Sequence, residues 1–194
     1  ESYLLGNTSL AYDIDNTFGN ELILITVLTI VSMIIIIALT FKSISIPIIL
    51  VLLIQGAIWI SMSYSVIANK SLYFLAYIIA QCIQMGATID YAILLTNNYT
   101  QYREKYNKKE AIKNALQASI LTIFTSALVL IVATSTIAII SSQELISTIC
   151  VVIGRGTAIS ALVVLLVLPA YLVCFDKLIG KTTAKVKFIK DNKK

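Results

Sequence analysis

The sequence of 194 residues contains no histidine, and only 13% of its residues are charged. Without histidine, the chain lacks the side chain that most often exchanges protons near neutral pH and binds metals. Its three cysteines, Cys82, Cys150 and Cys174, lie in apolar runs without paired spacing, which favours packing over metal binding or disulfides. No glycine-rich phosphate loop or nucleophile–base pair occurs either. The sequence therefore argues against an enzyme, and we predict no cofactor and no metal ion.

Apolar residues are abundant instead, at 58% of the chain, with a mean hydropathy of +0.90. Ordinary globular domains are about 45–50% apolar and about 25% charged, so the composition favours a membrane protein. A helix needs roughly 20 apolar residues to cross a bilayer core, and the alternating pattern of barrel strands is absent. We predict an all-α membrane protein, a bundle of five transmembrane helices near residues 21–41, 46–67, 72–99, 113–139 and 145–175.

The basic residues predict how this bundle is oriented. If the N-terminus is outside, the residues on the cytoplasmic side are Lys42, five basic residues between 103 and 113, and the seven lysines after Phe175. Only Lys70 would lie outside, and Arg155 falls within a span. The positive-inside rule therefore predicts a multi-pass protein of the plasma membrane with a cytoplasmic C-terminus. Where the third helix leaves the bilayer, we expect an interfacial belt of three tyrosines: Tyr99, Tyr102 and Tyr106.

Both ends of the chain differ from the apolar middle. Residues 1–20 mix polar residues with Leu10, Ile14 and Phe18, which recur at helical spacing. We expect a short amphipathic helix here, at the end of an extracytoplasmic domain that lies mostly upstream. Residues 21–176 form the predicted transmembrane domain. Residues 177–194 are a basic cytoplasmic tail that would attract anionic lipids, although obeying the positive-inside rule is an equally good explanation.

Asp90 is the only charged residue between Lys70 and Arg103. Counting back from the Asn98–Tyr99 edge places it about 12 Å into the membrane, where an aspartate is costly and normally faces a bundle interior or a wet cavity. Such a carboxylate is a candidate for binding and releasing protons, and the neighbouring Tyr91 hydroxyl could hold it or pass a proton on. The alternative is a structural aspartate that forms hydrogen bonds between helices.

Two further features could support a proton relay at Asp90. Gly86 and Asn97 share its helical face, and Gly86 would let another helix approach closely. On the fourth predicted helix, three hydroxyl residues lie at i, i+3 and i+7 with a fourth alongside: Ser119, Thr122, Ser126 and Thr125. We expect Asp90 to face the bundle interior near these hydroxyls, which could equally be ordinary helix–helix contacts.

Arg155 is the second charge inside a predicted span. It follows Glu144 by about ten residues, so we place it nearer the outer boundary than Asp90, and we expect no ion pair between them. Gly154 and Gly156 flank it, which leaves room for close packing or for the side chain to bend outward. The sequence does not identify its partner.

The stretch "GATIDYAILLTNNYTQYRE", followed by "KKEAIKNALQASILTIFTSALVL", resembles the fourth- and fifth-helix region of RND-superfamily transporters of the MMPL type. "TFKSISIPIILVLL" is similar to the turn between that family's second and third helices. "IGRGTAISALVVLLVLPAYLVCFDKLI" is similar to its sixth helix, and "LAYDIDNTF" to the close of its porter domain. The resemblance covers nearly the whole chain.

This resemblance implies one half of a twelve-helix transporter, with the chain supplying the last five helices of the C-terminal half. Asp90 and Tyr91 match the proton-relay pair of the family, and Thr125 and Ser126 match its polar fifth-helix positions loosely. The implied function is proton-driven export of lipids or other hydrophobic compounds. The implied partners are the other half of the transporter and the hydrophobic substrate, not nucleic acid, and a homo-oligomer is compatible with the sequence. A sterol-sensing-like lipid-binding or scaffold domain, or a channel-like subunit, would be the alternatives.

Overall fold

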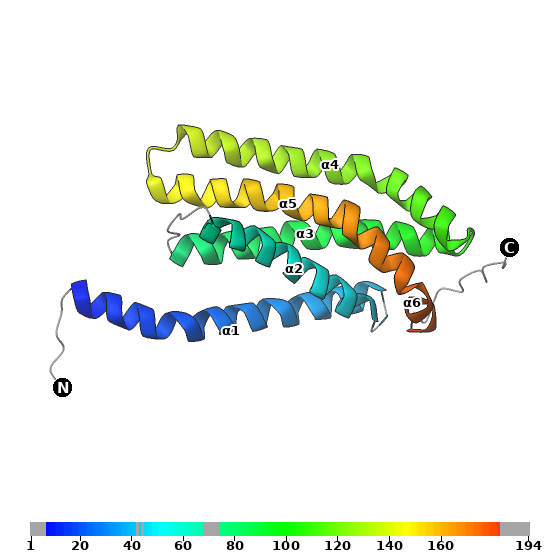
Figure 1. The fold of residues 1–194 in the computed structure, drawn as a ribbon, viewed down its shortest axis with the longest axis horizontal. Helices are drawn as coiled ribbons and strands as arrows, with labels where there is room; N and C mark the ends of the chain where they lie inside the picture. The colour runs from blue at the N-terminus through cyan, green and yellow to red at the C-terminus, as the bar shows by residue number, and fades with distance from the viewer. Residues whose placement is uncertain (1–6, 42, 44, 68–73, 183–194) are drawn as a thin grey trace.

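A computed structural model describes residues 7–41, 43, 45–67 and 74–182 of the chain, and within these residues it contains helices and no strand (Figure 1). Five of the helices are long and apolar enough to cross a membrane. The prediction of a bundle of five transmembrane helices is therefore confirmed. The helices are α1 (Asn7–Phe41), α2 (Ser45–Ile67), α3 (Phe74–Arg103), α4 (Lys108–Ile140), α5 (Glu144–Cys174) and the short α6 (Asp176–Thr182).

The helix boundaries differ from the expected ones mainly at polar ends. Residues 7–20 are helical, as expected, but they continue directly into the first span and do not form a short helix of their own. Helix α4 begins five residues earlier than predicted, and Glu110 lies in its first turn, where a carboxylate favours the helix dipole. Helix α6 was not predicted. The assignment of residues 1–20 to a porter domain stays a prediction, and residues 183–194 of the basic tail lie outside the described residues.

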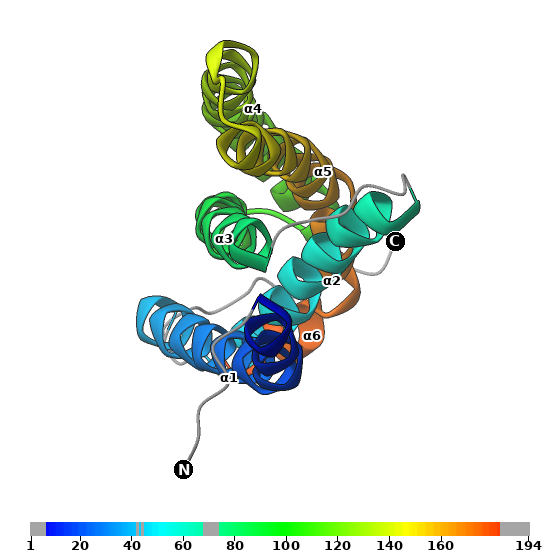
Figure 2. The ribbon, with the colours of Figure 1, turned by 90° about the vertical axis from the view of Figure 1, so that its left-hand side faces the viewer.

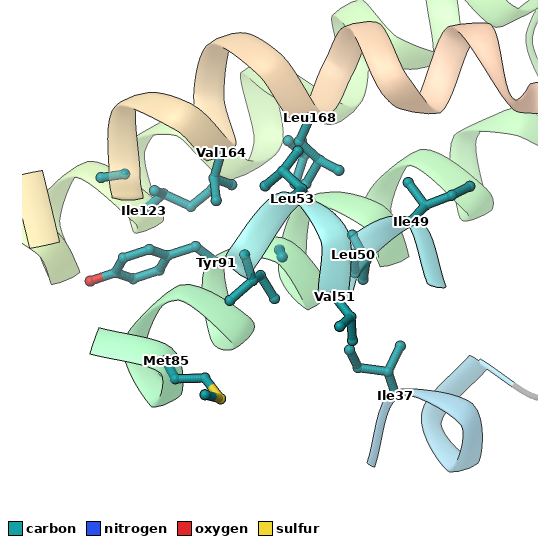
Figure 3. Close-up of a cluster of buried hydrophobic side chains, with 14 of the residues drawn as sticks. Ile37, Ile49, Leu50, Val51, Leu53, Met85, Tyr91, Ile123, Val164 and Leu168 are labelled. Atoms are coloured by element: carbon teal, nitrogen blue, oxygen red, sulfur yellow. The ribbon is translucent and has the colours of Figure 1, made fainter. Parts of the chain in front are cut away.

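Helix α3 contacts each of the other four long helices. Viewed along the bundle, it has α4 and α5 on one side and α2 and α1 on the other (Figure 2). A buried apolar cluster fills the space between these helices, with Leu53 of α2, Tyr91 of α3, Ile123 of α4 and Val164 of α5 among its members (Figure 3). On the remaining side of α3 the view shows no other described helix (Figure 2). One face of α3 is therefore left uncovered by the other described helices.

The two glycines of α5 explain how closely its neighbours approach. A Cβ atom on Gly154 would lie 2.7 Å from the Thr134 Oγ1 of α4. A Cβ atom on Gly156 would collide with the Gln84 side chain of α3. Because lipid is as apolar as the helices, such small residues are what allow membrane helices to pack tightly. The close-packing role that we considered for these glycines is confirmed.

Candidate functional site

Asp90 is exposed in this five-helix bundle, on the uncovered face of α3. Its neighbours at helical spacing, Ile83, Gly86 and Asn97, are exposed as well, and we call these four residues the Asp90 face. The grouping of Gly86, Asp90 and Asn97 on one side of the helix is as predicted. The expected orientation of Asp90 toward the interior of this bundle is wrong, because a different arc of α3 contacts the other four helices.

The Asp90 face has room for another helix. A Cβ atom placed on Gly86 would meet no atom within 4 Å, in contrast to the crowded glycines of α5. Among the residues that the structure describes, none forms a hydrogen bond or an ion pair with the Asp90 carboxylate. The part of the chain that the structure describes therefore provides neither a hydrogen-bond or ion-pair partner nor a cover for the carboxylate.

Tyr91 points in a different direction from Asp90, because successive helical residues are about 100° apart. Its side chain is buried and belongs to the central apolar cluster, where Figure 3 shows it with Ile123 and Val164. No hydrogen bond joins Asp90 and Tyr91, both of which lie in the described part of the chain. Asp90 and Tyr91 are adjacent in sequence, but Tyr91 lies on the packed face of α3 and Asp90 lies on its uncovered face.

The four hydroxyl residues of α4 are divided in the same way. Ser119 is fully buried, and its Oγ accepts a hydrogen bond of 2.8 Å from the Asn98 amide of α3. Thr122, Thr125 and Ser126 are exposed, and the Thr125 hydroxyl donates to the Leu121 carbonyl oxygen of its own helix at 2.9 Å. The four residues therefore do not form one interior polar face, because only Ser119 contacts α3 through a hydrogen bond.

The Asn98–Ser119 hydrogen bond sets the register of the two helices, which run in opposite directions (Figure 1). Asp90 lies eight residues before Asn98, and Ser126 lies seven residues after Ser119. At 1.5 Å per residue these positions are about 12 Å and about 10 Å from the bond, in the same direction. Asp90 and Ser126 therefore lie at nearly the same depth, and both are exposed.

Arg155 contacts α2 and not Asp90. Its guanidinium carbon lies 4.6 Å from the centroid of the Tyr64 ring, a cation–π contact, and its Nη2 donates to the Ser61 carbonyl oxygen at 3.4 Å. The contact between Gly156 and Gln84 places Arg155 level with Ile83, about 10 Å along the bundle from Asp90. The predicted absence of an Arg155–Asp90 ion pair is confirmed, and α2 supplies the contacts that the sequence left open.

A buried ionic cluster at the predicted cytoplasmic end was missed by the sequence analysis. Arg103 at the end of α3 binds both carboxylate oxygens of Asp176, Nε to Oδ1 and Nη2 to Oδ2, each at 3.0 Å. The Tyr99 hydroxyl donates to the same Asp176 Oδ1 at 2.6 Å. All three side chains are buried, so Tyr99 does not belong to the expected interfacial belt. The sequence signal was weak: one acidic residue at the start of a lysine-rich tail.

Among the described residues, no group of three or more His, Cys, Asp or Glu residues lies close enough to hold a metal ion. What α3 presents is one unpartnered carboxylate in the middle of a membrane span, beside an open glycine and level with a serine of α4. Such a group can exchange a proton or meet a polar group on another surface.

Comparisons with known proteins bear on the family to which this chain belongs. A model of the MMPL family matches residues 1–188. No curated protein matches the chain. Because the family match spans nearly the entire sequence and the structure is a bundle of membrane helices, this chain belongs to the MMPL family.

Proposed function

We propose that this chain is part of a proton-driven exporter of lipids or other hydrophobic compounds, with Asp90 as its proton carrier. The observation that supports this most is the exposed, unpartnered Asp90 in the middle of α3. Membership of the MMPL family, whose members are transporters and not enzymes, supports the broader class. We infer the plasma membrane as its location, with the α3–α4 turn facing the cytoplasm, from the distribution of lysine and arginine.

The position of Asp90 argues that something covers it in the working protein. An aspartate at the centre of a membrane helix costs about 2.5–3.5 kcal/mol, and such residues face protein or water instead of lipid. In our proposal the other half of a twelve-helix transporter packs against the Asp90 face. Gly86 supports this, because it leaves space for close approach of a helix backbone.

The proton cycle follows from the two charge states of Asp90. A water or polar group on the outer side transfers a proton to the ionised carboxylate, which becomes neutral and compatible with a dry interface. Loss of that proton toward the cytoplasm restores the charge and favours a hydrated or hydrogen-bonded arrangement. One charge moving through 100 mV provides about 2.3 kcal/mol, and a pH gradient adds to this. The difference between the two states would bias how the halves pack.

The neighbouring residues have distinct parts in this proposal. The Ser126 and Thr122 hydroxyls are exposed at or near the depth of Asp90, where they can order water or donate to the carboxylate. The Thr125 hydroxyl is occupied by its own helix, so its part is smaller. Tyr91 is the second relay residue, and its hydroxyl would exchange protons with Asp90 through water or through a group of the other half.

The experiment that tests the proposal is proton-coupled export from vesicles containing the complete protein. Asp90→Asn keeps the shape of the side chain but cannot ionise, so export should be abolished while the folded protein remains in the membrane. Asp90→Glu retains the charge and should keep part of the activity. Asn97→Ala, on the same face of α3, is the matched control and should export at close to the normal rate. Full export by Asp90→Asn would end the relay hypothesis.

One observation favours the alternative of a lipid-binding or scaffold domain. An apolar groove of about 200 Å³ lies between α4 and α5, lined by residues that include Phe124, Ala127, Ala158 and Leu162. A groove of this kind within membrane spans could hold an acyl chain without any transport. In that case lipid binding should be the same in Asp90→Asn and in the unmodified protein, and no proton-dependent export should be measurable in either.

A further inference from the structure

Arg155 lies on the arc of α5 that faces away from the other described helices. Val151, Leu162 and Leu166 are within about 40° of it around the helix, and all three are exposed. Arg155 itself is partly exposed. Because α5 is long and apolar enough to span a membrane, this exposed apolar arc is suited to lipid. Arg155 therefore places a cation on the lipid-facing side of α5 and not in the interior of the bundle.

The Arg155 side chain extends toward the predicted outer end of the bundle. The neighbouring Gly156 is level with Ser61 of α2, and Tyr64 lies three residues, or about 4.5 Å, further outward along α2. The Arg155 guanidinium carbon is 4.6 Å from the centroid of the Tyr64 ring, which is exposed. A long cationic side chain that bends in this way brings its charge toward the headgroups of a bilayer.

An apolar groove begins less than one helical turn inward from Arg155. It has a volume of about 200 Å³ and lies between α4 and α5. Its α5 wall extends from Ala158 to Leu165, about 10 Å along the helix. Leu162 belongs both to this wall and to the exposed arc of Arg155. A cation and an apolar groove therefore follow one another along α5, with the cation at the predicted outer end. The residues that line the groove are all apolar: Phe124, Ala127, Leu128, Ile131, Ala158, Ala161, Leu162 and Leu165.

The local charge identifies the ligand that would fit this arrangement. Arg155 is the only charged residue among residues 45–67, 114–140 and 145–174, which form most of α2, α4 and α5. The surface at the outer end of the groove is therefore positive and complementary to an anion. A guanidinium group presents paired N–H donors that match the oxygens of a phosphate, and the groove matches a hydrocarbon chain.

We propose that Arg155 and the α4–α5 groove together bind one anionic phospholipid of the predicted outer leaflet. Its phosphate oxygens accept hydrogen bonds from the Arg155 guanidinium, which keeps its contact with Tyr64, and one acyl chain extends inward into the groove. A phospholipid of the outer leaflet has this direction, with its head outward and its chains toward the midplane. The proposal concerns lipid binding and does not depend on the proposed proton relay at Asp90.

Photocrosslinking in lipid nanodiscs tests this site. The complete protein would be placed in nanodiscs of phosphatidylcholine that contain a small fraction of a probe lipid with a diazirine in one acyl chain. The probe is phosphatidylglycerol in one arm and phosphatidylcholine with the same chains in the other. After illumination, mass spectrometry of the peptides measures how strongly each probe labels the groove residues of α4 and α5. No gradient is applied, so the result does not depend on whether the protein exports.

We expect phosphatidylglycerol to label the groove about fivefold more strongly than phosphatidylcholine, because one basic residue attracts an anionic lipid by about that factor. Arg155→Gln keeps a polar side chain but removes the charge, so the two probes should then label equally. Lys105→Gln removes a positive charge from the exposed α3–α4 turn, and it is the matched control that should keep the full preference. Ala158→Phe fills the groove and should reduce labelling by both probes.

Equal labelling by the two probes in the unmodified protein would overturn the proposal, because it would indicate ordinary surrounding lipid only. An unchanged preference in Arg155→Gln would overturn it as well, and so would unchanged labelling in Ala158→Phe. If Arg155→Gln fails to fold, the comparison of the two probes on the unmodified protein still decides the question.

Discussion

Asp90 is a residue of α3, and Asp176 of α6 binds side chains of α3. The surroundings of these two carboxylates are opposite. Asp176 is buried and receives hydrogen bonds from Arg103 and Tyr99. Asp90 is exposed and has no hydrogen bond or ion pair within the described part of the chain. A charge that its own chain satisfies holds the fold together. A charge that its own chain leaves unsatisfied is free to change its protonation state or to meet another surface.

The largest effect on stability is expected at the satisfied carboxylate. Asp176→Asn leaves the buried Arg103 charge without its counter-ion, and breaking such a pair costs about 3–5 kcal/mol. The free energy of unfolding in mild detergent would measure this loss. The double variant Arg103→Met with Asp176→Leu removes both charges and should recover most of the stability. If the single variant were as stable as the unmodified protein, the cluster would not be what holds α3 to α6.

Glycine substitutions compare the crowded and the open sides of α3. Gly156→Ala forces a methyl group against the Gln84 side chain, and such overpacking costs about 1–3 kcal/mol. Gly86→Ala meets no atom within 4 Å, so this chain should lose no stability from it. Thermal unfolding of the two variants side by side measures the difference. Equal losses would mean that the Asp90 face is covered in the protein under study.

Two serines of α4 make the same comparison on a smaller scale. Ser119→Ala removes the acceptor of the Asn98 amide, which should cost about 1 kcal/mol. Ser126→Ala removes an exposed hydroxyl, so stability should stay the same while export falls moderately. Unfolding and vesicle export measured on both variants would separate structural from functional hydroxyls. A stability loss at Ser126 equal to that at Ser119 would contradict this division.

The smallest effect on the stability of this chain is expected at Asp90 itself. Asp90→Asn breaks no interaction that the structure describes, so its unfolding curve should overlay that of the unmodified protein even though export is lost. Asp176→Asn is expected to behave in the opposite way, because its main effect is a loss of stability. A marked loss of stability in Asp90→Asn would favour the structural interpretation of this aspartate.

The helices could be predicted from the sequence because each is a local property. Charge-free runs of the required length lead to five spans within a few residues of those observed. Helical spacing alone grouped Gly86, Asp90 and Asn97 on one side of α3. Arg155 was separated from Asp90 by counting residues along the helices, and the structure agrees.

The orientation of α3 could not be predicted in the same way, because it depends on which neighbours cover which arc of the helix. A mid-membrane aspartate was expected inside the bundle, yet α1, α2, α4 and α5 together cover the arc that holds Gln84 and Tyr91. Likewise, Arg103 and Asp176 are 73 residues apart, and nothing in either local stretch shows that the ends of α3 and α5 meet.

By itself, therefore, the sequence determined that this chain crosses a membrane as five helices and that one carboxylate lies in the middle of the third. Hydrophobicity and helical periodicity are sufficient for both conclusions, because each is set by residues adjacent in the chain. Only the tertiary structure decided that Asp176 is paired, that Asp90 is not, and that α4 and α5 leave an apolar groove between them. These outcomes depend on how separate helices approach one another, which is set by side-chain packing across the bundle.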